Sequence, residues 1–588
     1  MTAARHQDRE RQIREAEELL GAERTHSLAK GLFFGRLDAG LAFPYPELNA
    51  EESATFPSYL GQVRSFLRDE VDPVRIDRDA RVPDAVMSRL FDLGIMTMSI
   101  SSEHGGLGLS QFAYCKVMEE LGAVDGSLAV LVNAHQSIGV KSLILFGTPE
   151  QKAEWLPRLV QGRMLAAFAL TEPNAGSDAG GIETRAVLNE AGTHYVLNGR
   201  KQWITNGGIA GLLAVMAKVP GTQDEKGRER ITAFLVTPDM PGFQVVDPAM
   251  EKMGIRGTWT AKLAFDNLEV PVENIIGAPG KGLRVALTLL DFGRTTFGAT
   301  CTGAAKRCLH DALEHCRTRR QFGKALIEFD LVKKKLARMA AWSFAMECAT
   351  GLTAGFIDRG LEDYMLETAM LKVFGSEALW EIVNDTVQLF GGRAYFTDLP
   401  YERMLRDARL NLIGEGANDV LRTFIALVGM RDVGLSLKDM VDSLKTPLTG
   451  LGRVADFARR HLPGQDAVAV PLRSRELADH GRLLGELVQD FGRAVEALLI
   501  RRREGVLDRQ YDQARIADAS TEIYHVIAVL SRLDALIQSG EVSTSDGQRQ
   551  QRAGRYYIAL AERNIRRNLR EIGDPLDEAI APVADGLA

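Results

Sequence analysis

The sequence predicts a mainly α-helical protein with a central β-domain. Three observations support this fold class. Helical spacing of apolar residues runs from about residue 59 to 162, short apolar runs bounded by turn residues follow to about residue 275, and long helical patterns return from residue 282. A chain of 588 residues is too long for a single hydrophobic core, so we expect three or four domains.

Changes in residue pattern divide the chain into six predicted segments. They are an N-terminal arm (1–54), an N-terminal helical domain (55–164), a middle β-domain (165–278), a helical-bundle domain (279–431), a linker that is also a candidate membrane-contact segment (432–471) and a C-terminal helical domain (472–588). No repeat period accompanies this order of elements.

Local patterns justify the first two domains. Val86, Leu90 and Leu93 lie three or four positions apart, which is the spacing of one face of a helix. In the next segment, runs such as residues 231–236 lie between Pro, Gly, Asp and Asn residues. Those short runs and turns predict a small antiparallel β-domain.

Long helical patterns with few prolines characterise the bundle domain and the C-terminal domain. One apolar stripe is interpreted as core packing, and it consists of Leu331, Leu336, Met339 and Trp342.

The segment that follows Arg431 supports two interpretations. Apolar residues share one helical face and basic residues are interspersed among them: Leu444, Leu448, Leu451, Val454 and Phe457, with Lys445, Arg453, Arg459 and Arg460. This pattern fits peripheral contact with a membrane. Pro447, Gly450 and Gly452 interrupt the helix, so a packing or linker role stays equally open.

Composition excludes several classes of protein. The 71 basic and 78 acidic residues give a net charge of −7, so binding to nucleic acid is not expected. The five cysteines include no C-x-x-C pair, which argues against a disulfide scaffold or a metal site and favours a reducing compartment. No run of about eighteen apolar residues is evident. The acidic N-terminus does not resemble a secretory or mitochondrial signal, so either a bacterial cytoplasmic protein or an already processed chain is expected.

Two stretches concentrate groups suited to a cofactor. Residues 171–178, Thr-Glu-Pro-Asn-Ala-Gly-Ser-Asp, combine hydroxyls, glycine and exposed backbone amides, which suits a polar, anionic ligand at close approach. An ordinary turn is the alternative interpretation. Residues 202–208 place an indole and a hydroxyl at the end of a strand-like run.

Common nucleotide and metal motifs do not occur. The segment Gly280-Lys281-Gly282-Leu283-Arg284-Val285 lacks the third glycine of a Rossmann fingerprint and follows a proline rather than a strand. A Walker A loop and an H-E-x-x-H helix are also missing. A dinucleotide therefore has to be held by other means.

Six motifs in a fixed order resemble those of the acyl-CoA dehydrogenases. They are residues 171–178, residues 202–208, the R-x-x-F-G element at 319–323, the Q-x-x-G-G element at 388–392, Arg406-Asp407-Ala408 and the run 414–419 (Gly-Glu-Gly-Ala-Asn-Asp). The resemblance spans about residues 56 to 431. The entry segment 43–46 and the tail, including 498–503, are similar to the very-long-chain branch, which carries an additional C-terminal helical domain. The resemblance implies a helical domain, a small β-barrel or sandwich, a four-helix bundle and that extra domain.

The activity that the resemblance implies is FAD-dependent oxidation of an acyl-CoA to the trans-2-enoyl-CoA. The α C–H bond is a poor acid, so the reaction needs a positioned base and a polarised carbonyl. By resemblance Glu415 is that base, and the β hydrogen leaves as hydride to the flavin. An apolar acyl slot is expected to raise the pKa of Glu415 by desolvation. Gly416 lets the backbone approach the substrate closely.

The resemblance also implies roles for other residues. Those expected to contact the isoalloxazine ring or the phosphate region of FAD are Phe168, Leu170, Thr171, Ser177, Trp203, Thr205, Ala417 and Asp419. Those expected to grip the ADP half of FAD across a dimer interface are Arg319, Phe322, Gln388 and Gly392. Those expected to contact the substrate are Ser177, Asp291, Arg294, Gly416 and Gly139.

Four positions bear on departures from the family pattern and on the preferred acyl chain length. The family usually has an aromatic residue where this chain has Gly414, and many members have Thr where it has Ala417. Gly139 is retained from a pattern in which small residues deepen the acyl channel, but Ser142 stands where the very-long-chain branch tends to have a second glycine. We expect a long-chain preference, because each buried methylene adds about 0.8 kcal/mol of transfer free energy.

The sequence therefore predicts a homodimeric long-chain acyl-CoA dehydrogenase of fatty acid β-oxidation that passes electrons to an electron-transfer flavoprotein. Peripheral contact with the inner membrane face is part of this expectation through residues 432–471. An acyl-CoA oxidase or flavin monooxygenase on the same fold is one alternative. A respiratory-complex assembly protein derived from the family is another, and Glu415 argues against it.

Overall fold

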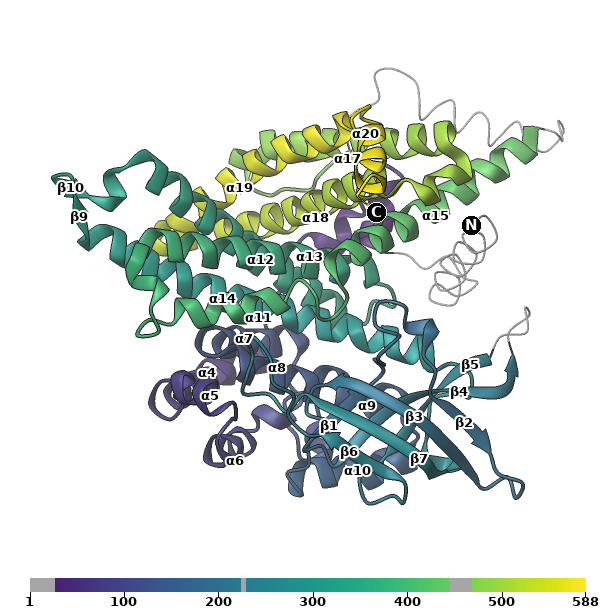
Figure 1. The fold of residues 1–588 in the computed structure, drawn as a ribbon. Coiled ribbons are helices and arrows are strands. Elements are labelled where there is room, and N and C mark those ends of the chain that lie inside the picture. Colours follow the sequence, from purple (N-terminus) through teal and green to yellow (C-terminus); the bar gives the residue numbers. More distant parts are fainter. Residues whose placement is uncertain (1–26, 224–228, 445–467, 588) are drawn as a thin grey trace.

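The structure, a computed structural model, describes residues 27–223, 229–444 and 468–587. Figure 1 shows the N-terminal helices and the sheet at the bottom, a helical bundle across the middle and the C-terminal helices above it. The elements follow the predicted order of helices, strands, helices and further helices. The predicted fold class, mainly α with a central β-domain, is confirmed.

Short helices with clear start signals build the N-terminal domain. The Asn49 side chain accepts the N–H of Glu52 at the start of one helix, and Thr148 and Gln151 form a capping box at the start of another. The helices are α4 (Ala50–Asp69), α5 (Pro73–Asp79), α6 (Asp84–Asp92), α7 (Gln111–Val124), α8 (Gly126–Asn133), the π-helical η3 (Ala134–Val140), α9 (Lys141–Phe146) and α10 (Pro149–Gln161).

The middle domain is one eight-stranded sheet in the order β6-β7-β3-β2-β4-β5-β8, with β1 beside β4. Most pairs are antiparallel, but β1 and β2 run parallel to β4, so the wholly antiparallel prediction was wrong. At least one other strand lies in the chain between the members of each parallel pair, as expected because parallel neighbours cannot be joined by tight hairpins. The strands are β1 (Ala166–Ala169), β2 (Arg185–Leu188), β3 (His194–Ile204), β4 (Leu212–Gln223), β5 (Glu229–Val236), β6 (Phe243–Asp247), β7 (Ala261–Pro271) and β8 (Ile275–Ile276).

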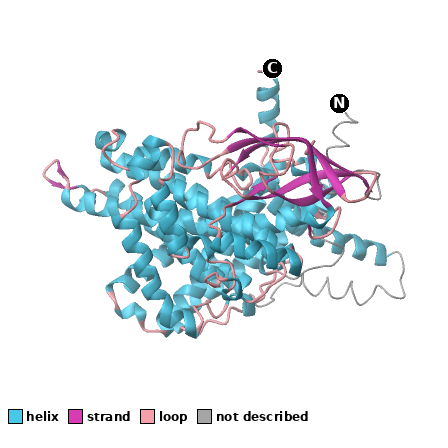
Figure 2. Ribbon diagram, turned by 90° about the horizontal axis from the view of Figure 1, so that it is seen from below, coloured by secondary structure: helices cyan, strands magenta, loops and turns pink. Residues whose placement is uncertain are grey.

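Four long helices form the bundle: α11 (Gly282–Thr318), α12 (Asp330–Asp358), α13 (Met365–Phe390) and α15 (Asn418–Leu444). The shorter α14 (Tyr401–Leu410) precedes α15. Between α11 and α12 the chain forms a small hairpin of β9 (Arg320–Gln321) and β10 (Lys324–Ala325), which projects from the helical body in both views (Figure 2).

The C-terminal domain shares one hydrophobic core with the bundle. Its helices are α17 (Ala478–Arg502), α18 (Gln510–Gln538), α19 (Ser545–Arg570) and α20 (Asp577–Asp585). Buried side chains of α12, α13, α15, α17 and α18 belong to the same apolar cluster. The arm joins this cluster through α2 (Leu28–Phe33), where the ring of Phe33 meets that of Phe491 edge-on at 5.1 Å. A further short helix, α3 (Ala39–Ala42), follows α2.

Two predicted details differ from the structure. Leu331 is 76% exposed, whereas Leu336 and Met339 of the same predicted stripe are buried. Leu331 occupies the second position of α12, next to the projecting hairpin, where no neighbouring helix covers it.

The boundary predicted after Arg431 falls inside α15, which continues to Leu444. Most of the candidate membrane-contact residues, from Lys445 onward, lie outside the described residues.

One helical stretch within the described ranges, Gly126–Phe146, is long and apolar enough to cross a membrane by length and composition. The stretch contains Asn133, His135, Gln136 and Lys141, so it is not an uninterrupted apolar run of the kind the sequence analysis looked for. Its mean hydropathy is 1.4, and 72% of the stretch is buried inside the protein, as in a core helix. The stretch passes through η3 and lies beside β1 and α11.

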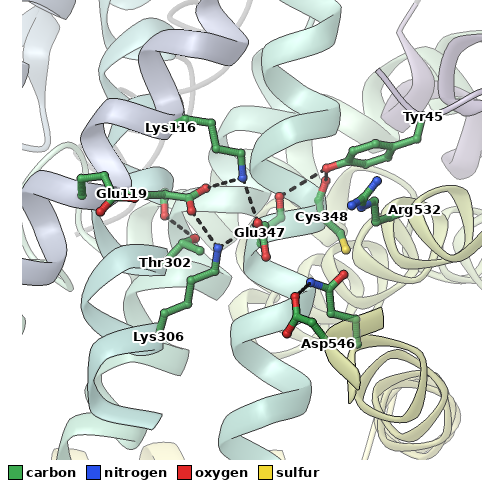
Figure 3. A network of polar contacts seen from close by, with 12 residues as sticks. Tyr45, Lys116, Glu119, Thr302, Lys306, Glu347, Cys348, Arg532 and Asp546 are labelled. Atoms are coloured by element: carbon green, nitrogen blue, oxygen red, sulfur yellow. Dashed lines mark hydrogen bonds and ion pairs between the residues drawn. The ribbon is translucent and has the colours of Figure 1, made fainter. Parts of the chain in front are cut away.

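A cluster of four charged side chains joins the N-terminal domain to the bundle (Figure 3). Lys116 of α7 contacts Glu119 at 3.1 Å and Glu347 of α12 at 2.8 Å. Lys306 of α11 contacts the same two carboxylates, each at 2.8 Å. The hydroxyl of Tyr45 donates to the Cys348 carbonyl at 2.9 Å beside this cluster. Each cation therefore bridges two carboxylates, and the four side chains together connect α7, α11 and α12.

Candidate functional site

Two backbone segments meet where β1 ends and β3 ends. The N–H of Gln202 donates to the carbonyl of Thr171 at 2.9 Å. Beneath this contact the ammonium of Lys201 donates to the Leu170 carbonyl at 2.9 Å and to the Glu172 carboxylate at 2.7 Å. Both charged side chains are buried. A buried ion pair that also bonds the Leu170 backbone fixes the relative position of the two loops.

The side chains predicted to surround the flavin line this junction. Phe168 and Leu170 are buried, and Thr171 and Thr205 are half-buried. Trp203 has a left-handed backbone with φ of 59° and is 55% exposed. A large indole held outward in a sparsely populated conformation marks a contact surface for a ligand. Ser177 lies exposed on the loop that follows Thr171.

Two hydrogen bonds and one close packing contact connect this junction to the predicted base. The buried amide of Asn206 donates to the Leu131 carbonyl of α8 at 3.0 Å. At the end of α8, Asn133 donates to the carbonyl of Gly293 on α11 at 3.3 Å. A β-carbon placed on Gly293 would lie 2.7 Å from Oε2 of Glu415. Contacts through α8 and α11 therefore connect the loops predicted to contact the flavin with Glu415.

Glu415 lies in the loop between α14 and α15. Its backbone φ is 59° and that of Gly416 is 97°, so two successive residues adopt left-handed conformations. The Oε2 atom is buried and accepts no hydrogen bond from any described residue. Burial raises the pKa of Glu415, and the positive charges of Arg294 and Lys372 partly oppose that shift.

Two buried cations hold the backbone of this loop. Arg294 donates through Nε to the Glu415 carbonyl at 3.2 Å. Lys372 donates through Nζ to the Gly416 carbonyl at 2.7 Å and to Oδ1 of Asn418 at 2.7 Å. Burial lowers the pKa of Lys372 to about 7. A strained loop with both carbonyls bound is held in one conformation.

Asp291 and Arg294, predicted to contact CoA, are both buried on α11. Asp291 accepts from Arg294 at 3.2 Å and from the Thr368 hydroxyl at 2.9 Å. Burial raises the pKa of Asp291 to about 6, and Arg294 opposes this rise. Their described contacts hold the base loop, and a contact with CoA stays a prediction.

Gly139 is buried in η3, where a β-carbon would lie 2.8 Å from Cβ of Ala166 and 3.0 Å from its carbonyl carbon. Glycine at this position therefore lets η3 pack directly against β1. The Ser142 hydroxyl donates to the Gly139 carbonyl at 2.6 Å. The hydroxyl that distinguishes this chain at position 142 is thus internally satisfied, and a role of Gly139 in an acyl channel stays a prediction.

The four residues predicted to grip the ADP half of FAD lie elsewhere. Arg319, Phe322, Gln388 and Gly392 are all exposed at one end of the bundle. Arg319 follows Arg294 by 25 positions along α11, about 37 Å at 1.5 Å per residue. These four residues therefore lie far along the bundle from the base loop that Arg294 holds, and their contact with FAD stays a prediction.

Ala417 and Asp419 complete the predicted set. Ala417 is half-buried beside Gly416, and Asp419 is exposed at the second position of α15. Both therefore lie within a few residues of Glu415, on the loop and on the first turn of the helix that follows it.

Three functional positions escaped the sequence analysis: Gly293, Lys372 and Asn418. Lys372 lies between Leu371 and Val373 on a helix whose neighbouring residues are buried. A single lysine in such an apolar run signals a charge that requires a partner. Gly293 and Asn418 carry no comparable signal, because their importance arises from contacts across the fold.

Four family models match the chain. They are described as the acyl-CoA dehydrogenase N-terminal domain (residues 58–163), middle domain (167–268) and C-terminal domain (280–429), and the ACAD9/ACADV C-terminal domain (475–582). A helical and β-domain framework around a buried carboxylate and an exposed indole defines the class of flavin-dependent acyl-CoA oxidoreductases, and these matches agree with that class.

Similar proteins span most of the chain. The very long-chain specific acyl-CoA dehydrogenase of Rattus norvegicus mitochondria is 36% identical over 522 residues, covering 87% of this chain and 80% of that protein. A probable acyl-CoA dehydrogenase of Mycobacterium tuberculosis, FadE10, is 34% identical over 528 residues with the same coverage. A solved acyl-CoA dehydrogenase from Bacillus anthracis complexed with FAD is 28% identical, with a TM-score of 0.77 and coverage of 92% and 91%.

The chain belongs to the acyl-CoA dehydrogenase family. It is an oxidoreductase of the class that acts on the CH–CH bond of acyl-CoA, and the cofactor of this family is FAD. The outward Trp203, the half-buried hydroxyls of Thr171 and Thr205 and the unbonded carboxylate oxygen of Glu415 fit a flavin and a substrate between them.

Proposed function

We propose that this enzyme dehydrogenates long-chain acyl-CoA at the α and β carbons and transfers the electrons to an electron-transfer flavoprotein. The observation that supports the chemistry best is the buried, unbonded Oε2 of Glu415, held on a loop with both carbonyls bound. The long-chain preference draws on the very-long-chain relatives and the matching C-terminal domain model.

Glu415 acts as the general base in this proposal. Burial raises its pKa in the free enzyme, which strengthens the base that removes the α proton. Arg294 and Lys372 keep the carboxylate in place by holding its backbone. FAD supplies the hydride acceptor when it is bound beside Trp203, Thr171 and Thr205. The apolar side chains Phe168 and Leu170 exclude water from that side of the site.

The proposed assembly is a homodimer in which each subunit contributes to the cofactor site of the other. The ADP-gripping residues lie about 37 Å along α11 from Arg294, which favours their use by a partner. Large apolar side chains are exposed near the same end: Phe322 (94%), Leu331 (76%), Tyr395 (82%) and Phe396 (66%). Exposed apolar groups of this size are typical of an interface.

The partner and the location are part of the proposal. A solved structure described as the electron transferring flavoprotein of Acidaminococcus fermentans is 33% identical with a TM-score of 0.60, covering 64% of this chain and 97% of that one. The association of this fold with an electron transferring flavoprotein in that structure motivates the proposed acceptor. We propose that the enzyme is cytoplasmic and makes peripheral contact with the membrane.

The decisive experiment uses the purified flavoprotein under anaerobic conditions. Long-chain acyl-CoA should bleach the yellow flavin absorbance of the wild type. A Glu415→Gln variant should keep its FAD and show no bleaching, because the amide cannot accept the α proton. Flavin that no acyl chain length bleaches in the wild type would refute the proposal. Peroxide formation in air without another acceptor would favour the oxidase alternative.

A further inference from the structure

The conformation of the base loop requires support from outside the loop. Glu415 is a non-glycine residue in the left-handed region, and such residues persist only where surrounding structure fixes them. Lys372 supplies part of that support through the Gly416 carbonyl. What holds Lys372 therefore also bears on the position of Glu415.

Lys372 is itself held by the start of α15. Its ammonium donates to Oδ1 of Asn418 at 2.7 Å. The other end of the Asn418 amide donates to the Ser376 hydroxyl at 3.0 Å and to Oε1 of Glu377 at 3.1 Å. Because both ends of the amide are bonded, its orientation toward Lys372 is fixed.

Glu377 connects this arrangement to the C-terminal domain. Arg422 of α15 donates to both oxygens of Glu377, each at 2.7 Å, in a bidentate pair. The remaining Nε of Arg422 donates to Asp518 of α18 at 2.7 Å. A planar guanidinium that is hydrogen-bonded on two sides cannot rotate without breaking the bonds to one of its partners.

We infer that the C-terminal domain positions the catalytic base, with Asp518 as its positioning residue. The contacts run continuously through Asp518, Arg422, Glu377, Asn418, Lys372 and Gly416. Asp518 fixes Arg422, Arg422 fixes Glu377, and the pair orients the amide that holds Lys372. The domain thus orders the site as well as extending the core. This inference rests on the proposed role of Glu415 as the base.

The test compares Asp518→Asn with Asp577→Asn in full-length holoenzyme. Asp577 also forms a two-nitrogen contact with an arginine of α18, Arg515, but its contacts lead away from the base loop. Asp518→Asn should raise hydrogen exchange at residues 412–417 and lower kcat about tenfold, with FAD content unchanged. Asp577→Asn should change neither. Equal exchange and equal kcat in the two variants would overturn the inference.

A second pair of variants separates positioning from general stability. Lys372→Met removes a positive charge that lowers the pKa of Glu415, so the activity profile should shift to higher pH. Lys372→Arg keeps the charge and should keep the profile, with a lower kcat. Asp518→Asn leaves the Lys372 charge in place and should leave the profile unshifted. A shift of equal size in all three variants would contradict the inference.

Hydrogen exchange at the base loop can be measured without turnover, so it tests the structural link separately from the proposed activity. If the wild type fails to oxidise any acyl-CoA, the proposed function is refuted, but the exchange comparison between Asp518→Asn and Asp577→Asn still tests the structural link. If Lys372→Met does not fold, the two aspartate variants and Lys372→Arg carry the comparison.

Discussion

Gly293 lies against the carboxylate of Glu415, the proposed base, so Gly293→Ala should impair catalysis while leaving the fold intact. The β-carbon of the alanine would lie 2.7 Å from Oε2 of Glu415 and 3.2 Å from Cγ2 of Ile138. Both neighbouring atoms are at the ends of side chains, which can move. The helix itself should gain up to about 1 kcal/mol, because alanine favours the helix interior over glycine.

The displacement follows from the contact distance. An ordinary contact begins at 3.4 Å, so the Glu415 oxygen must move by 3.4 − 2.7 = 0.7 Å. A misplacement of about 1 Å costs on the order of 100-fold in rate, so a loss of about 10- to 100-fold is expected. That loss corresponds to about 1.4–2.7 kcal/mol of transition-state stabilisation.

Stopped-flow measurement of anaerobic flavin reduction by acyl-CoA tests this prediction, with thermal unfolding measured in parallel. The matched control is Gly61→Ala in α4, where a β-carbon meets no atom within 4 Å. The control should gain stability and keep full activity. Unchanged reduction by Gly293→Ala, or equal activity losses in both variants, would refute the reasoning.

Three further predictions follow from the charges and the tail. Glu415 must be deprotonated to act as a base, and burial raises its pKa. The value of kcat/KM should therefore fall as the pH is lowered through that raised pKa. A flat profile between pH 5 and 9 would contradict this prediction. Burial opposes ionisation of Glu347, yet Lys116 and Lys306 hold its pKa well below the ordinary range. Glu347→Gln should therefore lower the unfolding free energy by about 1–2 kcal/mol at neutral pH, measured by denaturant titration, and the difference should shrink in acid as the wild-type carboxylate is protonated. In liposome flotation, full-length protein should float with vesicles and a truncation before residue 432 should not; equal flotation would remove the tail from membrane contact.

The order of helices and strands could be predicted from the sequence because it depends on local patterns. Apolar spacing near Val86 and Leu90, and turn-bounded runs such as residues 231–236, report the period of each element directly. The strand directions could not be predicted in the same way. Whether β1 runs parallel to β4 depends on how the whole segment between them, which includes β2 and β3, crosses the sheet.

Leu331 shows the limit of periodicity. The spacing predicts a buried stripe, but burial also requires a neighbouring element, and none covers the first turn of α12. In the same way, the apolar stretch Gly126–Phe146 passes for a membrane span by composition, although most of it is enclosed by protein. Composition shows that a helix prefers apolar surroundings. Only the fold shows whether the protein core or a membrane supplies those surroundings.

The sequence by itself determined the family, the expected cofactor and Glu415 as the candidate base, because motifs of fixed order are visible along the chain. Only the tertiary structure decided what positions that base. Gly293, Lys372 and Asp518 lie 122, 43 and 103 positions from Glu415, yet direct or relayed contacts connect them to it. Contacts and hydrogen bonds between remote segments leave no local pattern in the sequence, so they can be identified only in the folded structure.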